Sequence, residues 1–500
     1  MCLLVLITWF SRWIPFTKCS CMLFGALLLV FAMGLSLLLF LGNTRYRLSE
    51  LLGLSFPLGI GQLGLLILLL DMCGIHHWGY VLPLLQLGLV SVWLVMFARK
   101  WKKEALWSRT VWKGWFDFKG WNVVFWVFFA AVVYLEFLNL SVTLYFPAYD
   151  IDSLRAFDTV GYILSKEQTL QGLSIFRADE NPFIHDPGSC IGYSPLFQLA
   201  YAYVYWAGGE TSKWIPALMF LSFLLALYGA CRRTMSPSAS MILIFFVMVT
   251  PRILEYSSWT ITNVMHMIYA SIGVIYAFLW LGSARQGDSG HGTSDNLYMW
   301  LSALFLSCNL LSRVEGVVFP LSVGVFALGY VFRKKIRFSH LLAWSLLVLL
   351  PFSFWTVFQN LSGMATETFF IMHPFLDKPK LYLVIVGFWN NIVNSTFFGY
   401  TVYVFFAAFV VSLYFAFKRK TLYLENCGIV MLALLFYALI IYHIEYVWDS
   451  LANVLNYSVM RFLFCFVPLV WYIAFQIPPV RKCFAILDDK LAFRTAETRR

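Results

Sequence analysis

Charged residues are scarce in this sequence: Asp, Glu, Lys and Arg make up 12% of its 500 residues, whereas hydrophobic residues make up 61%. A soluble domain carries about 25% charged residues, so this scarcity excludes an ordinary water-soluble enzyme. The mean hydropathy of +0.76 and the many aromatic residues, which favour the lipid headgroup level, point the same way. The composition predicts an all-α polytopic membrane protein in contact with the lipid bilayer.

Familiar catalytic and cofactor motifs are also missing. The sequence has no Walker loop, no GxSxG elbow, no HExxH and no GxGxxG after a strand. Its ten cysteines are scattered without a CxxC pair, so neither a zinc site nor a disulfide framework is expected. The formal charge of +11 would suggest nucleic acid in a soluble protein. In a membrane protein its distribution between loops matters more, and no nucleic-acid partner is expected.

Thirteen apolar stretches approach the roughly 20 residues that a spanning helix needs. They are 22–42, 53–72, 79–98, 122–143, 214–231, 239–256, 263–282, 297–313, 315–332, 340–358, 397–417, 427–444 and 461–478. A short polar sequence splits the region 297–332, which could form a hairpin or one long broken helix. We therefore expect a bundle of about 11–13 transmembrane helices.

The distribution of charge supports this alternation of spans. With the N-terminus outside, most Lys and Arg fall in loops expected to be cytoplasmic, and most acids fall on or near the outer side. Cytoplasmic loops of membrane proteins are enriched in Lys and Arg. The outer side then carries 144–213, 257–262, 359–396 and 445–460.

The outer segment 144–213 is the longest polar stretch of the chain. The spacing of its apolar residues predicts a helix over 152–164, with Asp152 or Ser153 as its N-cap. The aromatic run 196–206 is about half as long as a span, so it is expected to lie in the membrane interface. A second interfacial or re-entrant piece is expected over 381–393.

Two carboxylates, Asp150 and Asp152, open this segment directly after a span. Alternating residues of an extended segment point the same way, so both could face one ligand. They could bind a divalent cation such as Mg or Mn, or one of them could act as a general base. A helix cap beside a solvated acid is the alternative, because a lone DxD is a weak motif.

A second acidic group follows in the same segment. Asp179, Glu180, His185 and Asp186 lie among Asn and Pro residues and could bind a sugar. A turn rich in Asp, Asn and Pro is the alternative interpretation.

Arg313 and Glu315 lie between two apolar stretches, at the expected outer edge. Ionisable groups at membrane depth are rare and tend to be functional or paired. A structural ion pair is the alternative, but residues i and i+2 of a helix do not face each other. We therefore favour a functional role for both residues.

Arg461 opens the last span at the outer side, where few cations occur. With Lys378, Lys380 and Arg252 it could form an anion pocket for a phosphate. Snorkelling to the headgroups is the alternative for the two lysines. His266 lies inside a span and is expected to be a buried polar group with its hydrogen bonds satisfied.

The order of these pieces resembles the GT-C superfamily of membrane glycosyltransferases, in particular the group related to protein mannosyltransferases and lipid A aminoarabinose transferases. Three stretches carry the resemblance: Tyr149-Asp150-Ile151-Asp152-Ser153-Leu154, Tyr193-Ser194-Pro195-Leu196 and Ser312-Arg313-Val314-Glu315-Gly316. Two positions depart from the family pattern. Only Asn263 stands where an acidic residue is common, and Arg313 stands where Lys is common.

The resemblance implies transfer of a sugar from a polyprenyl-phosphate donor to a glycan, lipid or protein acceptor, with inversion at the sugar. Asp150 or Asp152 would be the general base, on the extracytoplasmic face of a bacterial inner membrane. Residues 1–120 would then hold N-terminal spans and a basic cytoplasmic loop, 121–480 the catalytic module, and 481–500 a basic cytoplasmic tail.

Three other functions remain open. A transporter or flippase for lipid-linked sugars would be expected to show inverted repeats and broken helices with charges near the midplane. An O-antigen polymerase or ligase would face outward as well, with Arg and His in its large outer loop. A receptor or scaffold would use the acidic loop as a docking surface.

Overall fold

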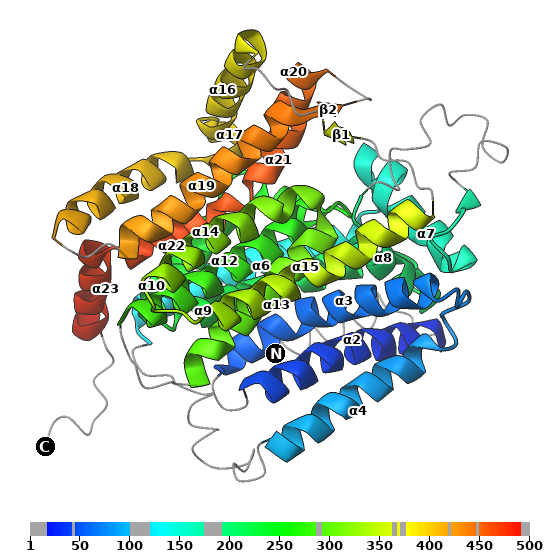
Figure 1. Ribbon diagram of the computed structural model, residues 1–500. Coiled ribbons are helices and arrows are strands. Elements are labelled where there is room, and N and C mark those ends of the chain that lie inside the picture. Colours follow the sequence, from blue (N-terminus) through cyan, green and yellow to red (C-terminus); the bar gives the residue numbers. More distant parts are fainter. Residues whose placement is uncertain are drawn as a thin grey trace, which may run out of the picture.

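The computed structural model describes residues 18–42, 46–100, 121–174, 193–286, 293–362, 368–370, 377–418, 422–446 and 450–491. These residues form an all-α polytopic membrane protein (Figure 1). Among them, nine helices are long and apolar enough to cross a membrane, and a bent helix pair near the C-terminus raises the number to ten.

The elements of the first half of the chain end just before residue 250. They are α2 (Lys18–Gly42), α3 (Leu48–Met72), α4 (Leu82–Lys100), α6 (Val123–Tyr145), the π-helix η2 (Ser153–Phe157), α7 (Asp158–Glu167), α8 (Leu196–Trp206), α9 (Trp214–Cys231) and α10 (Pro237–Met248).

The second half continues the bundle and adds two short strands. Its elements are α11 (Ile253–Ser257), α12 (Asn263–Gln286), α13 (Thr293–Ser312), the 3₁₀-helix η4 (Val314–Val317), α14 (Val318–Phe332), α15 (Phe338–Leu361), β1 (Thr368–Phe370), α16 (Lys378–Ile392), α17 (Ser395–Phe398), α18 (Thr401–Phe417), α19 (Leu422–His443), β2 (Ile444–Tyr446), α20 (Leu451–Val454), the π-helix η5 (Leu455–Val459), α21 (Met460–Leu463), α22 (Phe466–Gln476) and α23 (Pro478–Leu491).

A helix lies at each of the thirteen expected spans. Two of them, α10 and α18, are shorter than a full span, and the last is bent by 46° between α21 and α22. The region 297–332 is a hairpin. Tyr298, near the start of α13, bonds to Arg233, and Tyr330, near the end of α14, bonds to Glu425 at the same end of the bundle. The turn between α13 and α14 lies at the other end. Hydropathy therefore predicted where the helices lie, and the helices end at the short polar turns between the apolar stretches.

The centre of the bundle is α12, which packs against α9, α13, α14 and α22. Its spanning window is 94% buried, whereas those of α4 and α6 are only 17% and 22% buried. Small residues allow close helix contact in the N-terminal part: a Cβ on Gly34 would lie 1.8 Å from the carbonyl oxygen of Ser55. Close packing at small residues is a usual way for membrane helices to associate.

One end of the bundle, which we call the loop face, gathers the segments that charge placed on the outer side. Trp259 donates from its indole nitrogen to the Tyr149 hydroxyl at 2.9 Å, and strands β1 and β2 pair antiparallel between two of the outer segments. In Figure 1 these strands lie on the same side as α7 and α8, toward the upper right. Segments 144–213, 257–262, 359–396 and 445–460 therefore share one face in their described parts.

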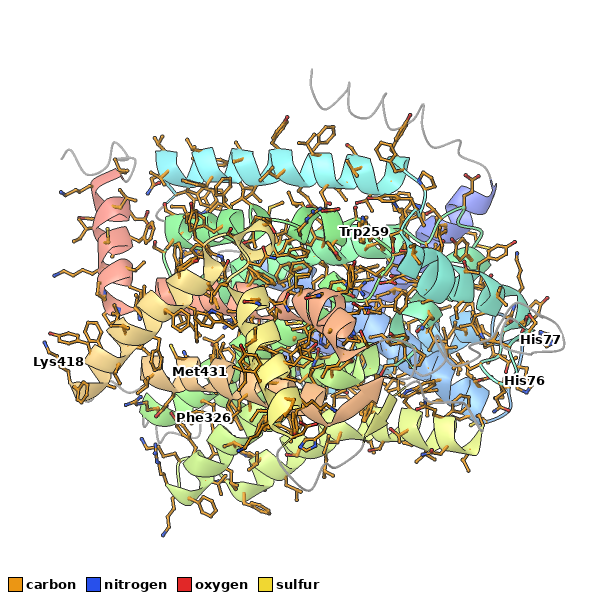
Figure 2. The ribbon with its side chains drawn as sticks, turned by 90° about the horizontal axis from the view of Figure 1, so that it is seen from above. His76, His77, Trp259, Phe326, Lys418 and Met431 are labelled. Atoms are coloured by element: carbon orange, nitrogen blue, oxygen red, sulfur yellow. The ribbon has the colours of Figure 1, made fainter. Side chains whose placement is uncertain are left out.

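The opposite end, which we call the basic face, gathers the described parts of the loops that are rich in Lys and Arg. There Arg233 contacts Glu50, and Asn122 donates to Asp488 of α23 at 2.7 Å. Figure 2 shows the same separation from above, with His76 and His77 at one end of the molecule and Lys418 at the other. The predicted alternation of sides is thus reproduced in the contacts.

Two expectations for the first large loop need correction. The helix over 152–164 is present as η2 and α7, but its first turn is capped by Asp150 rather than by Asp152 or Ser153. The half-length helix α8 does not lie at the surface, since each residue from Leu196 to Val204 is at most 2% exposed. Its sides are apolar and aromatic all round, and such a helix is buried rather than interfacial.

A candidate polar site at the loop face

Asp150 and Asp152 have different partners. Asp150 accepts the backbone N–H of Ser153 at 2.8 Å through one carboxylate oxygen and the Ser153 hydroxyl through the other. Asp152 pairs with Arg461, which begins the last span. The expectation that both carboxylates face one ligand is therefore wrong, because the backbone at Asp152 is helical rather than extended.

The two members of the Asp152–Arg461 pair come from segments that both contain a single π-helical turn. Asp152 directly precedes η2, and η5 ends two residues before Arg461. Such π turns occur often at functional sites. The Asp152 side chain is 42% exposed and that of Arg461 is 21% exposed, so this pair remains accessible from the loop face.

A buried lysine, Lys213, lies beside the capping acid. It is 2% exposed and its ammonium group stands 5.8 Å from the centre of the Tyr149 ring. Burial lowers the pKa of Lys213, while the nearby carboxylates of Asp150 and Asp158 act in the opposite direction. Few lysines are fully buried without paired charges, so this ammonium group depends on those two acids.

Asp158 is itself held in place by hydroxyl groups. It accepts from the Tyr205 hydroxyl at 2.8 Å and from the Ser212 hydroxyl. Burial raises the pKa of Tyr205, and the neighbouring Asp158 raises it further. Asp158, Ser212 and Lys213 therefore form one ionic cluster with Asp150, which we call the lysine cluster.

Arg313 and Glu315 form an ion pair, with 3.0 Å between the guanidinium and the carboxylate. The argument against this pairing was wrong because Arg313 is not on a helix: its φ of −157° and ψ of 135° are extended, and η4 begins after it. Arg313 also donates to the side-chain oxygen of Asn263 at 3.2 Å. Pairing does not exclude a functional role, which stays a prediction.

The turn after Arg313 is closed by a glycine. Asn309 donates to the Gly316 carbonyl oxygen at 3.0 Å, and a Cβ on Gly316 would lie 2.5 Å from that same amide group and 2.7 Å from the His266 ring. The absent side chain lets the turn lie directly against His266.

Several buried polar atoms around this turn have no partner among the described residues. They are the side-chain nitrogen of Asn263, Nε2 of His266, the amide oxygen of Asn309 and the hydroxyls of Thr260 and Thr262. His266 was expected to have its hydrogen bonds satisfied, but only its Nδ1 has a polar contact, 3.0 Å from the Ser312 hydroxyl. Buried polar groups are normally hydrogen-bonded, so this group of unpaired atoms needs an explanation. We call it the Arg313 cluster, together with Arg313 and Glu315.

Aromatic residues join these polar groups. Tyr193 interacts electrostatically with Arg313, and its ring lies 5.6 Å from that of Phe157 in η2. Tyr256 interacts electrostatically with both Asp152 and Arg461. The Asp152–Arg461 pair, the lysine cluster and the Arg313 cluster are therefore neighbours on the loop face, although they come from distant parts of the sequence.

The expected anion pocket is not assembled as predicted. Arg461 contacts Asp152, and Arg252 contacts Glu255 in an i, i+3 pair. Lys378 lies exposed at the start of α16, and Lys380 stands over the Tyr442 ring at 5.6 Å. Three of the four cations thus have separate neighbours and Lys378 is exposed, as is usual for long flexible side chains that extend toward water.

The expectation of a divalent cation held by both acids does not fit the described arrangement. Asp150 uses both oxygens on Ser153, and Asp152 is turned to Arg461. Within the described residues, three or more His, Cys, Asp or Glu side chains do not come together in a way that could hold a metal. Asp179, Glu180, His185 and Asp186 lie outside the described residues.

The ionisable residues missed by the sequence-based reasoning include Asp158, Lys213, Glu50 and Glu136. The two glutamates are buried within spans, and a carboxylate inside an apolar segment is a recognisable signal. Lys213 directly precedes a span, and Asp158 lies on the polar side of an amphipathic helix, so each also has an ordinary explanation.

Comparison with known proteins gives no further assignment. No family model matches the sequence, and neither the curated proteins nor the solved structures provide a match. The resemblance to membrane glycosyltransferases therefore rests on the three sequence stretches given above.

Proposed function

We propose that this protein is an integral-membrane glycosyltransferase that moves a sugar from a polyprenyl-phosphate donor to an acceptor at the loop face. The observation that carries the proposal is the Asp152–Arg461 pair, which joins residues 309 positions apart at an accessible place. It combines a base for the acceptor with a cation for the departing phosphate. The resemblance of the surrounding sequence to the GT-C superfamily agrees with this chemistry.

Asp152 is the better candidate for the general base. Both oxygens of Asp150 are used to cap the turn at Ser153, whereas Asp152 is 42% exposed. In the proposed step Asp152 takes the proton of the acceptor hydroxyl. The acceptor oxygen then forms a bond to the anomeric carbon, the carbon–oxygen bond to the lipid phosphate breaks, and the phosphate leaves with the bonding electrons.

Cations near this point support the second half of the step. Arg461 lies against Asp152, and Lys213 and Arg313 occupy the two adjoining clusters. Positive groups fixed where negative charge develops can supply several kcal/mol of transition-state stabilisation. Arginine also matches the geometry of a phosphate with two parallel hydrogen bonds.

The enrichment of the opposite face in Lys and Arg supports a cytoplasmic location for that face. The loop face would then be extracytoplasmic. The resemblance suggests the inner membrane of a bacterium and a donor whose sugar is already activated on lipid.

The test compares Asp152→Asn with Asp150→Asn, and uses Asp489→Asn, an exposed acid on α23, as the matched control. Mass spectrometry of lipid-linked and envelope glycans from cells producing each variant measures transfer. We expect a loss of about 10²–10⁴-fold for Asp152→Asn, the range for removal of a general base. Thermal unfolding of the purified variants checks that they remain folded.

The result that would overturn the proposal is full transfer by both single variants and by the double variant. A loss in Asp150→Asn alone would move the base to Asp150 and leave the reaction class in place. If the wild-type protein formed no product of sugar transfer, the assignment as an enzyme would itself be overturned.

A transporter of lipid-linked sugars is the second candidate, because one observation favours it. The last span is broken, with a bend of 46° next to Arg461, and transporters commonly bind substrates at discontinuous helices. Purified protein in vesicles separates the two functions. A transporter moves a lipid-linked sugar across the bilayer unchanged, whereas a transferase changes the masses of donor and acceptor.

A further inference from the structure

A cavity lies away from the loop-face site, between α6, α9 and α10. Its volume is about 530 Å³, and nearly all of its wall is apolar. The wall includes Phe129 and Val133 of α6, which are 38% and 49% exposed, so the cavity is a groove that is open to the side. We call it the α6 groove. In Figure 2 α6 lies along one edge of the bundle.

Two arginines stand at the basic-face end of this groove. Arg47 precedes α3 and Arg232 follows α9, and both are half-buried and line the groove. Both also lie close enough to the Tyr228 hydroxyl to interact with it electrostatically. One N–H group of Arg232 donates to the Met235 carbonyl oxygen at 2.7 Å. Two guanidinium groups around one point are suited to a phosphate, which each can bind through several N–H groups.

A carboxyl group interrupts the apolar wall on α6, one helical turn before Leu140, the last wall residue of that helix. Glu136 of α6 is 5% exposed and lines the groove. One of its oxygens accepts from Asn139 at 3.3 Å, and the other is buried without a partner among the described residues. Asn139 in turn accepts from Ser257 of the loop face at 2.9 Å. The groove is therefore cationic at its basic-face end and apolar along its length, with one carboxyl group toward the loop face.

The length of the apolar wall fits one leaflet of a bilayer. On the side of α9 the wall runs from Arg232 to Leu221, which are eleven residues or about 16 Å of helix apart. Half of the hydrocarbon core of a bilayer is about 15 Å thick. An acyl chain that starts at the basic face would thus end close to Glu136, whereas a much longer isoprenoid chain would have to pass it.

We propose that the α6 groove binds an anionic phospholipid of the basic-face leaflet, with its phosphate between Arg47 and Arg232 and one acyl chain along α6 as far as Glu136. This site is separate from the loop-face site and does not depend on the proposed transfer. The bound lipid covers apolar wall that α6, only 22% buried in its spanning window, leaves open. It also keeps α6 against α9 and α10 by occupying the space between them.

The experiment uses the purified full-length protein and native mass spectrometry to measure the retention of phosphatidylglycerol against phosphatidylcholine. We expect retention of phosphatidylglycerol to fall about tenfold for Arg47→Ala and again for Arg232→Ala, since each removes charge-assisted hydrogen bonds. Val133→Trp should also lower retention by filling the groove with both arginines intact. Asp152→Asn should retain the lipid normally, which separates this site from the loop-face proposal.

Arg333→Ala is the matched control, because Arg333 is a 67% exposed arginine of the same face whose carboxylate neighbour, Glu425, is 3.8 Å away. Unchanged retention in the double arginine variant or in Val133→Trp would overturn the proposal. So would equal retention of phosphatidylcholine, a co-purified mass that matches a polyprenyl phosphate, or a second copy of the chain bound in place of lipid. If the arginine variants fail to fold, Val133→Trp still decides the outcome.

Discussion

Two Arg–Glu pairs lie at opposite ends of the bundle, and their surroundings differ. At the basic face, Arg233 binds Glu50 with two hydrogen bonds of 2.6 and 2.7 Å. Glu50 is fully buried and also accepts from Tyr276, while Arg233 donates to Tyr298 at 3.0 Å. Each charged atom of this pair has a partner.

At the loop face, the Arg313–Glu315 pair is looser. Its two hydrogen bonds measure 3.0 and 3.4 Å, and the side chains are 11% and 22% exposed. The neighbouring Asn263 and His266 each keep one buried polar atom without a partner among the described residues. The comparison teaches that residue type alone does not distinguish a structural pair from a site. The unsatisfied polar atoms beside Arg313–Glu315 are the difference on which its proposed functional role rests.

The proposed difference between the two pairs would be contradicted if removal of the arginine had the same effect in both. Arg233→Ala leaves the Glu50 carboxylate buried without its partner, and such a loss costs about 3–5 kcal/mol of stability. Arg313→Ala should cost only about 1–3 kcal/mol, because Glu315 remains partly exposed, but it should lower transfer at the loop face. Thermal unfolding and the glycan assay of the two variants measure these effects. Equal destabilisation with unchanged transfer in Arg313→Ala would show that both pairs are structural.

Two glycines allow a finer comparison of the same regions. A Cβ on Gly229 would lie 2.7 Å from the Glu50 backbone, so Gly229→Ala should push α9 away from α3 and cost about 1–3 kcal/mol. The Cβ of Gly316→Ala meets the side chains of Asn309 and His266 instead.

Those side chains can move, so Gly316→Ala should affect transfer more than unfolding. Gly329→Ala serves as a control for both, because a Cβ there meets nothing within 4 Å. The distinction fails if Gly316→Ala unfolds as readily as Gly229→Ala while the remaining folded protein transfers sugar normally.

The smallest effect concerns Lys213. Burial lowers its pKa in the folded protein below 10.5, so at alkaline pH up to about 10.5 the unfolded chain holds a proton that the folded chain has lost. The free energy of unfolding therefore rises with pH in this window. Lys213→Met should abolish the rise, whereas Lys482→Met, which changes an exposed lysine of α23, should leave it. Melting temperatures across this pH range provide the measurement, and parallel curves for wild type and Lys213→Met would contradict the assignment.

Much of the fold could be predicted from the sequence because long apolar segments have few alternatives in a membrane. Each expected span met a helix, and the Lys and Arg distribution sorted the loops into two faces. The exception, α8, shows the limit: an apolar stretch of 11 residues is compatible with lying on a bilayer or inside a protein. Only its packing under α7 settles which.

The site was less predictable than the fold, for two physical reasons. Short-range geometry depended on one backbone turn, which made Asp150 a cap and turned Asp152 away from it. The long-range pair joins residues that are 309 positions apart in the sequence. No local pattern around Asp152 indicates Arg461 as its partner. Arg313 and Glu315 were expected not to pair because a helix was assumed where the chain is extended.

The π turns η2 and η5 beside the Asp152–Arg461 pair have a mechanical consequence. Each holds one residue more than an α-helical turn would. Shifting that extra residue along its segment rotates the side chains it passes by about 100°, while the membrane-crossing helices beyond it stay in place. The carboxylate and the guanidinium can thus separate and meet again through a local change of helical register, without any movement of the bundle that carries them.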